Sequence, residues 1–412
     1  MRKQKEQTWV KILRIALAAV FLFSGFTKAI DPVASAIQFE DYFTSFGMGF
    51  LHPIAMFCAV AMNIVELTLG FMLLCRIRMR FTAVVYLLFM VFFFFLTLWL
   101  FVAEYLEINH GYNFGVVKDC GCFGKAIEMS NLETFIKNVF IMIPTVIIFV
   151  KRKVIPDIRL TILGQWLLTV IFAVLVGLLQ LYCYQHLPVI DFGDWKKGKN
   201  IKETFIGEPA EKEMLFVYQN KQDSAIVHLT TEELMAITDK IPSFYNDYDY
   251  VDRMDTIVKK AIEPKIEGFS MVDSSAREYS LELITNDESQ YLFLLFMHDL
   301  NEVNSEGITS EKLQKLIQKC EENEITFVGI TTSTQEEVSL FVKEYQIDFP
   351  IYHQTIDPVK GPFMVRDAIR SNPGLILLKG GIVTHKWAWR DFPDFERIFP
   401  PLEGQGSEEA KK

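Results

Sequence analysis

The segment Phe81–Ala103 reads FTAVVYLLFMVFFFFLTLWLFVA, a run without a single charged side chain. A helix needs about 20 predominantly apolar residues to cross the hydrocarbon core of a bilayer. This run therefore predicts a transmembrane helix. Four further stretches are long and apolar enough for the same role: Trp9–Ile30, Pro53–Cys75, Glu133–Val150 and Arg159–Cys183. The sequence predicts an integral membrane protein with five crossings.

The first apolar stretch follows a basic start, Met1–Lys5, as the core of a secretory signal peptide would. The segment Gly25–Lys28 is a poor cleavage site, however, and the apolar run is longer than an ordinary signal-peptide core. We therefore interpret Trp9–Ile30 as an uncleaved membrane anchor.

Lysine and arginine residues gather in three clusters, and with five crossings all three fall on one side of the membrane: Arg2, Lys3 and Lys5; Arg76, Arg78 and Arg80; Lys151, Arg152 and Lys153. Loops rich in these residues face the cytoplasm. The N-terminus is then cytoplasmic, and the segments outside are Asp31–His52, Glu104–Leu132 and everything after Cys183. For a Gram-negative inner membrane this outer side is the periplasm, where disulfides persist.

The mean hydropathy of +0.21 averages an apolar part before Cys183 and an acidic, soluble part after it. A net charge of -10 argues against nucleic acid or anionic lipid as a partner of the outer part, because both require a basic surface. The expected partners are the bilayer itself and a periplasmic client or envelope protein. The expected layout is a transmembrane bundle at 9–150, a fifth helix at 159–183, a linker with a small α/β annex at 184–265, an α/β domain at 266–400 and a polar tail at 401–412.

Within the annex, Met214–Tyr218 and Ala225–Leu229 flank a polar segment and predict a β-hairpin. Thr231–Asp239 predicts a short helix that begins at a threonine cap. The acidic, tyrosine-rich stretch Asn246–Asp255 lacks the ligand spacing of a calcium loop, so we interpret it as a solvated loop.

The last domain alternates short apolar runs with amphipathic segments. Tyr291–Met297 is a continuous apolar run of the kind that forms a buried strand. Helices are predicted at Ser310–Cys320 and Thr334–Tyr345. Further strands are predicted at Ile266–Val272, Glu278–Leu283, Ile325–Thr331, Leu375–Leu378 and Ile382–His385.

This order of elements resembles the thioredoxin-like fold of the TlpA and peroxiredoxin kind over about residues 266–399. The resemblance implies a cis-proline at Asn372-Pro373, where the last hairpin opens. It also implies a CxxC or peroxidatic cysteine directly after the buried strand, but the chain has His298–Val303 (HDLNEV) there. A domain without a thiol at this position cannot attack a disulfide. Cys320 lies at the far end of the next helix and is interpreted as a packed thiol, so we expect the domain to be non-catalytic.

The membrane half resembles the DoxX/MauE family over about Trp9–Val150. The resemblance rests on Ser24–Pro32 (SGFTKAIDP), Asn63–Gly70 (NIVELTLG) and Asp119–Gly124 (DCGCFG). It implies a four-helix core, to which the fifth helix and the outer domain are additions. It also implies a role in maturation or disulfide formation of a periplasmic dehydrogenase subunit. DoxX relatives are named for a quinol oxidase association, but the helices here carry no heme histidines.

The paired thiols Cys120 and Cys122 are the main candidates for chemistry. Two cysteines one residue apart close only a small, strained ring, and strained disulfides exchange readily. Cys58 and Cys183 are expected toward the same side of the membrane, so a thiol relay is conceivable. Two alternatives stay open: a structural staple or buried apolar thiols, and a metal site, for which no third ligand has zinc spacing.

Glu66 is a carboxylate near the middle of the second apolar stretch, and it should face the bundle because an unpaired charge in lipid is costly. Lys28 is a candidate partner, yet a rise of ~1.5 Å per residue puts Glu66 about 15 Å deeper than Lys28. Pairing them would require shifted helix boundaries. The alternative is a hydrogen bond to a polar neighbour: Asn63, Thr97 or Gln165. A quinone or proton site at Glu66 is a third interpretation, and no other cofactor is predicted.

Two functions fit these features. The first is a membrane factor that assists thiol–disulfide exchange or maturation of periplasmic proteins through Cys120 and Cys122. The second is a non-catalytic membrane scaffold whose outer domain binds an envelope partner.

Overall fold

The computed structural model describes residues 6–112, 114–115, 117, 120–206, 211–259, 269–284, 290–354 and 363–400. The chain divides into two compact units. One comprises residues 1–199 and 270–412, and the other comprises residues 200–269.

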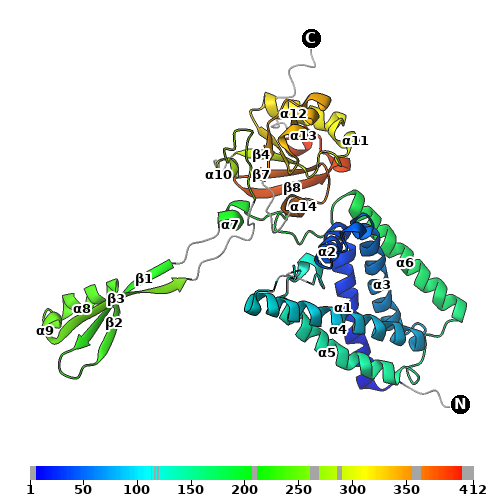
Figure 1. Ribbon diagram of the computed structural model, residues 1–412, viewed down its shortest axis with the longest axis horizontal. Coiled ribbons are helices and arrows are strands. Elements are labelled where there is room, and N and C mark those ends of the chain that lie inside the picture. The colour runs from blue at the N-terminus through cyan, green and yellow to red at the C-terminus, as the bar shows by residue number, and fades with distance from the viewer. Residues whose placement is uncertain are drawn as a thin grey trace, which may run out of the picture. The chain divides into compact units, whose positions relative to one another are not determined.

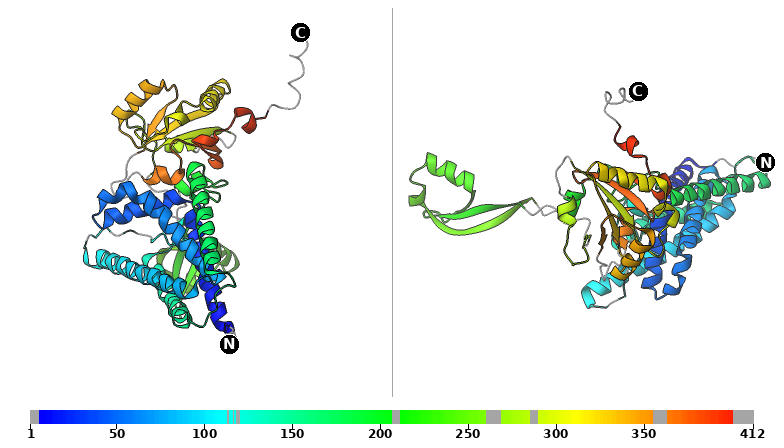
Figure 2. Two further views of the ribbon diagram at one scale, coloured as in Figure 1. Left: turned by 90° about the vertical axis from the view of Figure 1, so that its right-hand side faces the viewer. Right: turned by 90° about the horizontal axis from the view of Figure 1, so that it is seen from above.

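The N-terminal half is a bundle of apolar helices (Figures 1 and 2). Among the described residues, five helices are long and apolar enough to cross a membrane. They are α1 (Thr8–Ala29), α3 (Ala55–Cys75), α4 (Met79–His110), α5 (Asn131–Lys151) and α6 (Ile162–Gln185). The predicted five apolar helices are thus confirmed, and the chain is a multi-pass membrane protein.

Helices α1 and α3 approach each other so closely that two glycines are required between them. A Cβ atom on Gly25 would lie 2.9 Å from the backbone nitrogen of Leu67, and one on Gly70 would lie 3.0 Å from that of Leu22. Side chains of any size at these positions would force the helices apart. This close approach fixes how far α1 is shifted along α3, and it therefore determines which polar side chains of the two helices contact each other.

Hydrogen bonds connect α1, the α3–α4 turn and the α5–α6 loop at one end of the bundle. The Arg14 guanidinium donates to the Leu73 carbonyl at the end of α3, with an N–O distance of 2.8 Å. The backbone nitrogen of Met79, at the start of α4, donates to the Asp157 carboxylate at 2.7 Å. The start of α1, the α3–α4 turn and the α5–α6 loop therefore lie at the same end. The turn and the loop carry two of the three basic clusters, and the first cluster, Arg2, Lys3 and Lys5, lies outside the described residues.

The expected loop Asp31–His52 instead contains a helix, α2 (Pro32–Ser45), followed by the short 3-10 turn η1 (Gly49–Ile54). Asp31 caps α2 by accepting a hydrogen bond from the Ala34 backbone nitrogen at 3.0 Å, and Pro32 occupies the first helical position, where proline is favoured. Helix α2 packs against α3. Helix α3 is therefore flanked by α2 as well as by α1.

The C-terminal domain contains a five-stranded sheet in the order β6-β5-β4-β7-β8. Strands β4, β5 and β6 run parallel, whereas β7 is antiparallel to both β4 and β8. The strands are β4 (Tyr291–Met297), β5 (Thr326–Thr331), β6 (Ile351–His353), β7 (Gly374–Lys379) and β8 (Ile382–Ala388). The Asn372–Pro373 peptide bond before β7 is cis, as the sequence analysis expects.

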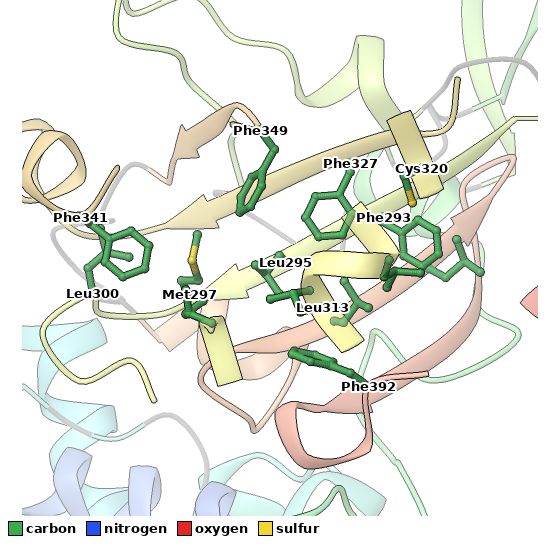
Figure 3. Packing of buried hydrophobic residues seen from close by; sticks show 14 of the residues in the cluster. Phe293, Leu295, Met297, Leu300, Leu313, Cys320, Phe327, Phe341, Phe349 and Phe392 are labelled. Carbon is green, nitrogen blue, oxygen red and sulfur yellow. The ribbon is translucent and has the colours of Figure 1, made fainter. Parts of the chain in front are cut away.

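The core of this domain lies between the sheet and the helices α12 (Glu311–Glu322) and α13 (Gln335–Tyr345). Figure 3 shows the side chains of Phe293, Leu295 and Met297 from β4 packed among residues of the helices and of β5. All three are fully buried. The continuous apolar run predicted as a buried strand is therefore the central strand of the sheet.

The two strands predicted before β4 are not formed as expected. Glu278–Leu283 is predicted as a strand, but Ser280–Ile284 forms the short helix α10. Val272 makes only isolated bridges, and residues 266–268 of the other predicted strand lie outside the described residues. The Ser280 hydroxyl accepts a hydrogen bond from the Met271 backbone nitrogen at 2.7 Å, so a side chain takes the place of a strand partner.

The second unit holds a three-stranded antiparallel sheet in the order β2-β1-β3. Its elements are α7 (Ile201–Ile206), β1 (Glu211–Asn220), β2 (Ile226–Thr230), α8 (Thr231–Lys240), α9 (Phe244–Asp247) and β3 (Tyr248–Lys259). The hairpin and the helix after it are formed as predicted, and Thr230 and Glu233 make a capping box.

The interpretation of Asn246–Asp255 as a solvated loop is wrong, because most of it belongs to β3. The Tyr250 ring packs against Tyr218 on β1, with ring centroids 5.7 Å apart, and Tyr248 stacks on Phe244 at 4.6 Å. These aromatic contacts stabilise a strand that its acidic residues alone would disfavour.

Candidate functional site

The CxCFG loop lies between α4 and α5, and its two thiols face each other. The Cys120 and Cys122 sulfur atoms are 3.2 Å apart, and both cysteines are free. The turn depends on Gly121, which has a φ of 64°. A Cβ atom there would also lie 2.7 Å from the Gln38 side-chain oxygen, so only glycine fits.

The loop is held to the bundle through its backbone and through Phe123. The Tyr42 hydroxyl donates to the Cys120 carbonyl at 3.2 Å, and the Ser24 hydroxyl contacts the Cys122 carbonyl. The Lys137 ammonium lies 4.5 Å from the centre of the Phe123 ring. Helices α1, α2 and α5 therefore position the loop.

Glu66 lies directly beneath this loop in a buried cluster with Lys28 and Ser24. The Lys28 ammonium is 2.5 Å from one Glu66 carboxylate oxygen, and the Ser24 hydroxyl is 2.5 Å from the other. The side chains of Lys28 and Glu66 are 13% and 5% exposed. A serine hydroxyl has one proton, so Ser24 can donate to Glu66 or to the Cys122 carbonyl but not to both at once. The cluster thus connects the buried ion pair to the loop.

The expected difference in depth between Lys28 and Glu66 is wrong, because the two side chains form an ion pair. The Asn63 amide donates to the Lys28 carbonyl at 3.2 Å, which puts the end of α1 level with Asn63, one helical turn from Glu66. The two helices do not end at the same height, because α3 continues outward under α2. The alternative partners are engaged elsewhere: Thr97 bonds to the Phe93 carbonyl, and Gln165 accepts from the Arg78 backbone nitrogen.

The polar network extends to α6 through a residue that the sequence analysis did not single out. The Asn63 amide lies 3.1 Å from the Gln180 side-chain oxygen, and the Gln180 amide donates to the Val60 carbonyl at 3.3 Å. A second glutamine within the apolar run of α6, fifteen residues after Gln165, was the available signal. The fifth transmembrane helix therefore shares the buried polar network.

The two thiols have different electrostatic surroundings. The hydrogen bond from the Cys120 thiol lowers the pKa of Cys122, and the ammonium groups of Lys137 and Lys28 lower it further, against the effect of burial. The same hydrogen bond, together with burial, raises the pKa of Cys120 well above its ordinary value. Only a thiolate attacks a disulfide, and of the two thiols Cys122 is the one that loses its proton more readily.

The remaining candidate residues of the bundle do not contact this site within the described part of the chain. Cys58 lies on α3 and is half-buried, and Cys183 lies on α6 and is buried. No sulfur contact joins either of them to the loop pair there, and the relay stays a prediction. No cluster of three metal-ligating side chains occurs in the described ranges.

In the C-terminal domain, His298 follows β4 where the sequence analysis looked for a thiol. Burial lowers the pKa of His298 to about 3, so its imidazole is neutral at neutral pH. Its backbone is fixed by the Asn372 side-chain oxygen and by Thr332. Cys320 is buried on α12, and burial raises its pKa to about 12. Such a thiol is almost entirely protonated and inert.

The protein is therefore a membrane protein with a polar site at one end of its apolar helix bundle. The site consists of the loop thiol pair and the buried ion pair that lies against it. Residues 6–151 match the model of the family described as methylamine utilisation protein MauE. The chain thus carries a MauE family domain, and Ser24, Lys28, Glu66 and both loop cysteines lie within it. No match to the chain is found among curated proteins.

Proposed function

We propose that the protein assists thiol–disulfide exchange, in the maturation of proteins outside the membrane, through Cys120 and Cys122. The observation that carries the proposal is the pair of free, facing sulfur atoms, 3.2 Å apart, near the ammonium groups of Lys28 and Lys137. A structural staple is less well supported, because hydrogen bonds from Ser24 and Tyr42 already hold the loop backbone. Residues 6–151 match the family described as methylamine utilisation protein MauE, and this match is consistent with a maturation role at the membrane.

The proposal requires the loop to lie outside the cytoplasm. Two of the basic clusters support this orientation, since they belong to the α3–α4 turn and the α5–α6 loop, which meet at one end of the bundle. The CxCFG loop contacts α1 near its C-terminal end, away from those segments. By the positive-inside rule the N-terminus is cytoplasmic, and the loop and the C-terminal domain are periplasmic.

A reporter enzyme that is active only outside the cytoplasm tests this orientation. Fusion after Leu187 should give an active reporter, because the chain has then crossed the membrane an odd number of times. Fusion after Arg78, in the basic α3–α4 turn, should give an inactive one. Activity at Arg78 together with inactivity at Leu187 would show that the orientation is inverted.

We further propose that the C-terminal domain has a thioredoxin-like fold and binds clients without catalysing exchange. Three features support this: the strand order, the antiparallel final hairpin and the cis Asn372–Pro373 bond before β7. His298 stands where such enzymes carry a cysteine, and the buried thiol of Cys320 is inert. The domain would then present clients to the loop pair of the bundle.

Trapping of mixed disulfides tests the exchange reaction. In membranes, one of the variants Cys120→Ser and Cys122→Ser should accumulate an adduct that dithiothreitol releases, because the resolving thiol is missing. The wild type should show little adduct. Acid quenching, alkylation and non-reducing electrophoresis of the full-length chain measure the adduct, and Cys320→Ser serves as the control that should behave as the wild type does.

If neither variant accumulates an adduct but both lose stability, the pair is a staple. If both keep wild-type stability and client oxidation, the scaffold function remains, in which the C-terminal domain binds an envelope partner. That second function is favoured by one observation, the absence of a reactive thiol among the described residues of the C-terminal domain.

A further inference from the structure

The residues beneath the CxCFG loop contact only one of its two cysteines among the interactions of the described residues. Ser24 contacts the Cys122 carbonyl and lies 2.5 Å from Glu66, which in turn is 2.5 Å from the Lys28 ammonium. All of these contacts are to Cys122 or to its supports. Cys120 is held instead through its carbonyl by Tyr42 on α2.

The two cysteines also differ in their exposure to solvent. Cys120 is 6% exposed, whereas Cys122 is half-buried. A sulfur atom that attacks a protein disulfide must be reached by the partner, and the resolving sulfur must reach only its neighbour. Cys122, the more exposed of the two residues, suits the first role, and Cys120, whose sulfur lies 3.2 Å away, suits the second.

Resting on the proposed exchange function, we propose that Cys122 is the attacking thiol, that Cys120 resolves, and that Ser24, Lys28 and Glu66 are positioning residues. Two ammonium groups supply positive charge around Cys122: Lys28, whose side chain Glu66 fixes, and Lys137 on α5, which lies 4.5 Å from the centre of the neighbouring Phe123 ring. Ser24 fixes the Cys122 backbone. The partner is a protein with an accessible disulfide.

The reaction balances without any further oxidant. The Cys122 thiolate attacks one sulfur of the partner disulfide, the partner's S–S bond breaks, and the departing partner thiolate takes up a proton. The Cys120 thiol then loses its proton and attacks the Cys122 sulfur. This forms the Cys120–Cys122 bond and releases the second partner thiol. Two electrons pass from the pair to the partner, and with an oxidised pair the same steps run in reverse.

The pH dependence of alkylation tests the role of Lys28. The full-length protein in detergent is labelled with iodoacetamide over a range of pH, and labelling of Cys122 and Cys120 is quantified by peptide mass spectrometry. Lys28→Met removes the positive charge, which disfavours the thiolate. The midpoint for Cys122 should therefore rise by about one pH unit, equivalent to about tenfold slower labelling below the midpoint. Lys28→Arg keeps the charge and should keep the wild-type profile.

Two further variants keep the test decisive. Lys28→Met leaves Glu66 without its partner, so the double variant Lys28→Met/Glu66→Gln, which leaves no unpaired charge, should show the same rise in a folded protein. Lys125→Met is the matched control, because Lys125 follows the same loop but pairs with Asp367 at 3.7 Å. It should leave the Cys122 midpoint unchanged.

The role of each thiol is tested with 4,4′-dithiodipyridine as the disulfide probe. Cys120→Ser should retain a stable adduct on Cys122, whereas the wild type should release both halves of the probe and form the Cys120–Cys122 disulfide. An unchanged Cys122 midpoint in both Lys28→Met variants, or a stable adduct on Cys120 with none on Cys122, would overturn this assignment. A stable adduct on Cys120 alone would leave the proposed exchange function standing. If neither Cys120→Ser nor Cys122→Ser formed an adduct in the membrane trapping experiment, the exchange function itself would be wrong.

Discussion

Replacement of Glu66 by glutamine is expected to lower the free energy of unfolding by about 3–5 kcal/mol, the range for breaking a buried ion pair by removing one partner. The reason is that the Lys28 ammonium, now 2.5 Å from the carboxylate, would remain buried without a counter-charge. Unfolding of the full-length chain in mixed detergent micelles, followed by circular dichroism, measures the loss.

A double-variant cycle identifies the cause. Replacing a buried pair by neutral groups of similar size is often close to neutral, so Lys28→Met/Glu66→Gln should recover most of the lost stability. Glu128→Gln, at an exposed position in the loop after CxCFG, is the control and should change stability by no more than about 0.5 kcal/mol. An equal loss in the single and double variants would show that the ion pair is not what stabilises this part of the bundle.

Truncation of Phe293 to alanine should cost the C-terminal domain about 3–5 kcal/mol, as is usual for a fully buried phenylalanine. Phe293 lies on the central strand β4, is 0% exposed, and packs against Phe327 of β5, with ring centroids 6.0 Å apart. Figure 3 shows it among the side chains that fill the space between sheet and helices. The alanine variant would leave a cavity that close-packed neighbours can fill only in part.

Hydrogen exchange of the β4 and β5 amides in the full-length chain measures this loss, because those amides exchange when the sheet opens. Leu340→Ala is the matched control, since Leu340 on α13 is 62% exposed and should change the exchange by no more than about 0.5 kcal/mol. Unchanged protection in Phe293→Ala would contradict the placement of β4 at the centre of the core.

Several features of this protein could be predicted because they depend on local patterns. The five apolar helices follow from the length and composition of their runs, and β4 follows from a continuous apolar segment. The hairpin of β1 and β2 follows from a polar turn between two apolar runs. The CxCFG segment is recognisable as a motif in the sequence, and the exchange chemistry proposed for it is still a prediction.

The errors have a common origin, which is that each depended on a partner distant in the sequence. The strand β3 was interpreted as a loop because its acidic residues give no sign of the tyrosine contacts with β1 and α9. The segment Glu278–Leu283 was interpreted as a strand although no neighbouring strand is available to pair with it among the described residues.

The sequence by itself determined that this is a membrane protein with five apolar helices, two loop thiols and a carboxylate, Glu66, within an apolar run, because hydropathy and motifs are properties of neighbouring residues. Only the tertiary structure decided that Glu66 pairs with Lys28 and that both lie beneath Cys122. That outcome depends on the offset between α1 and α3, which is set by the close approach at Gly25 and by the helix α2 that packs against α3. Counting residues from the expected membrane boundaries cannot supply this offset, because the two helices do not end at the same height.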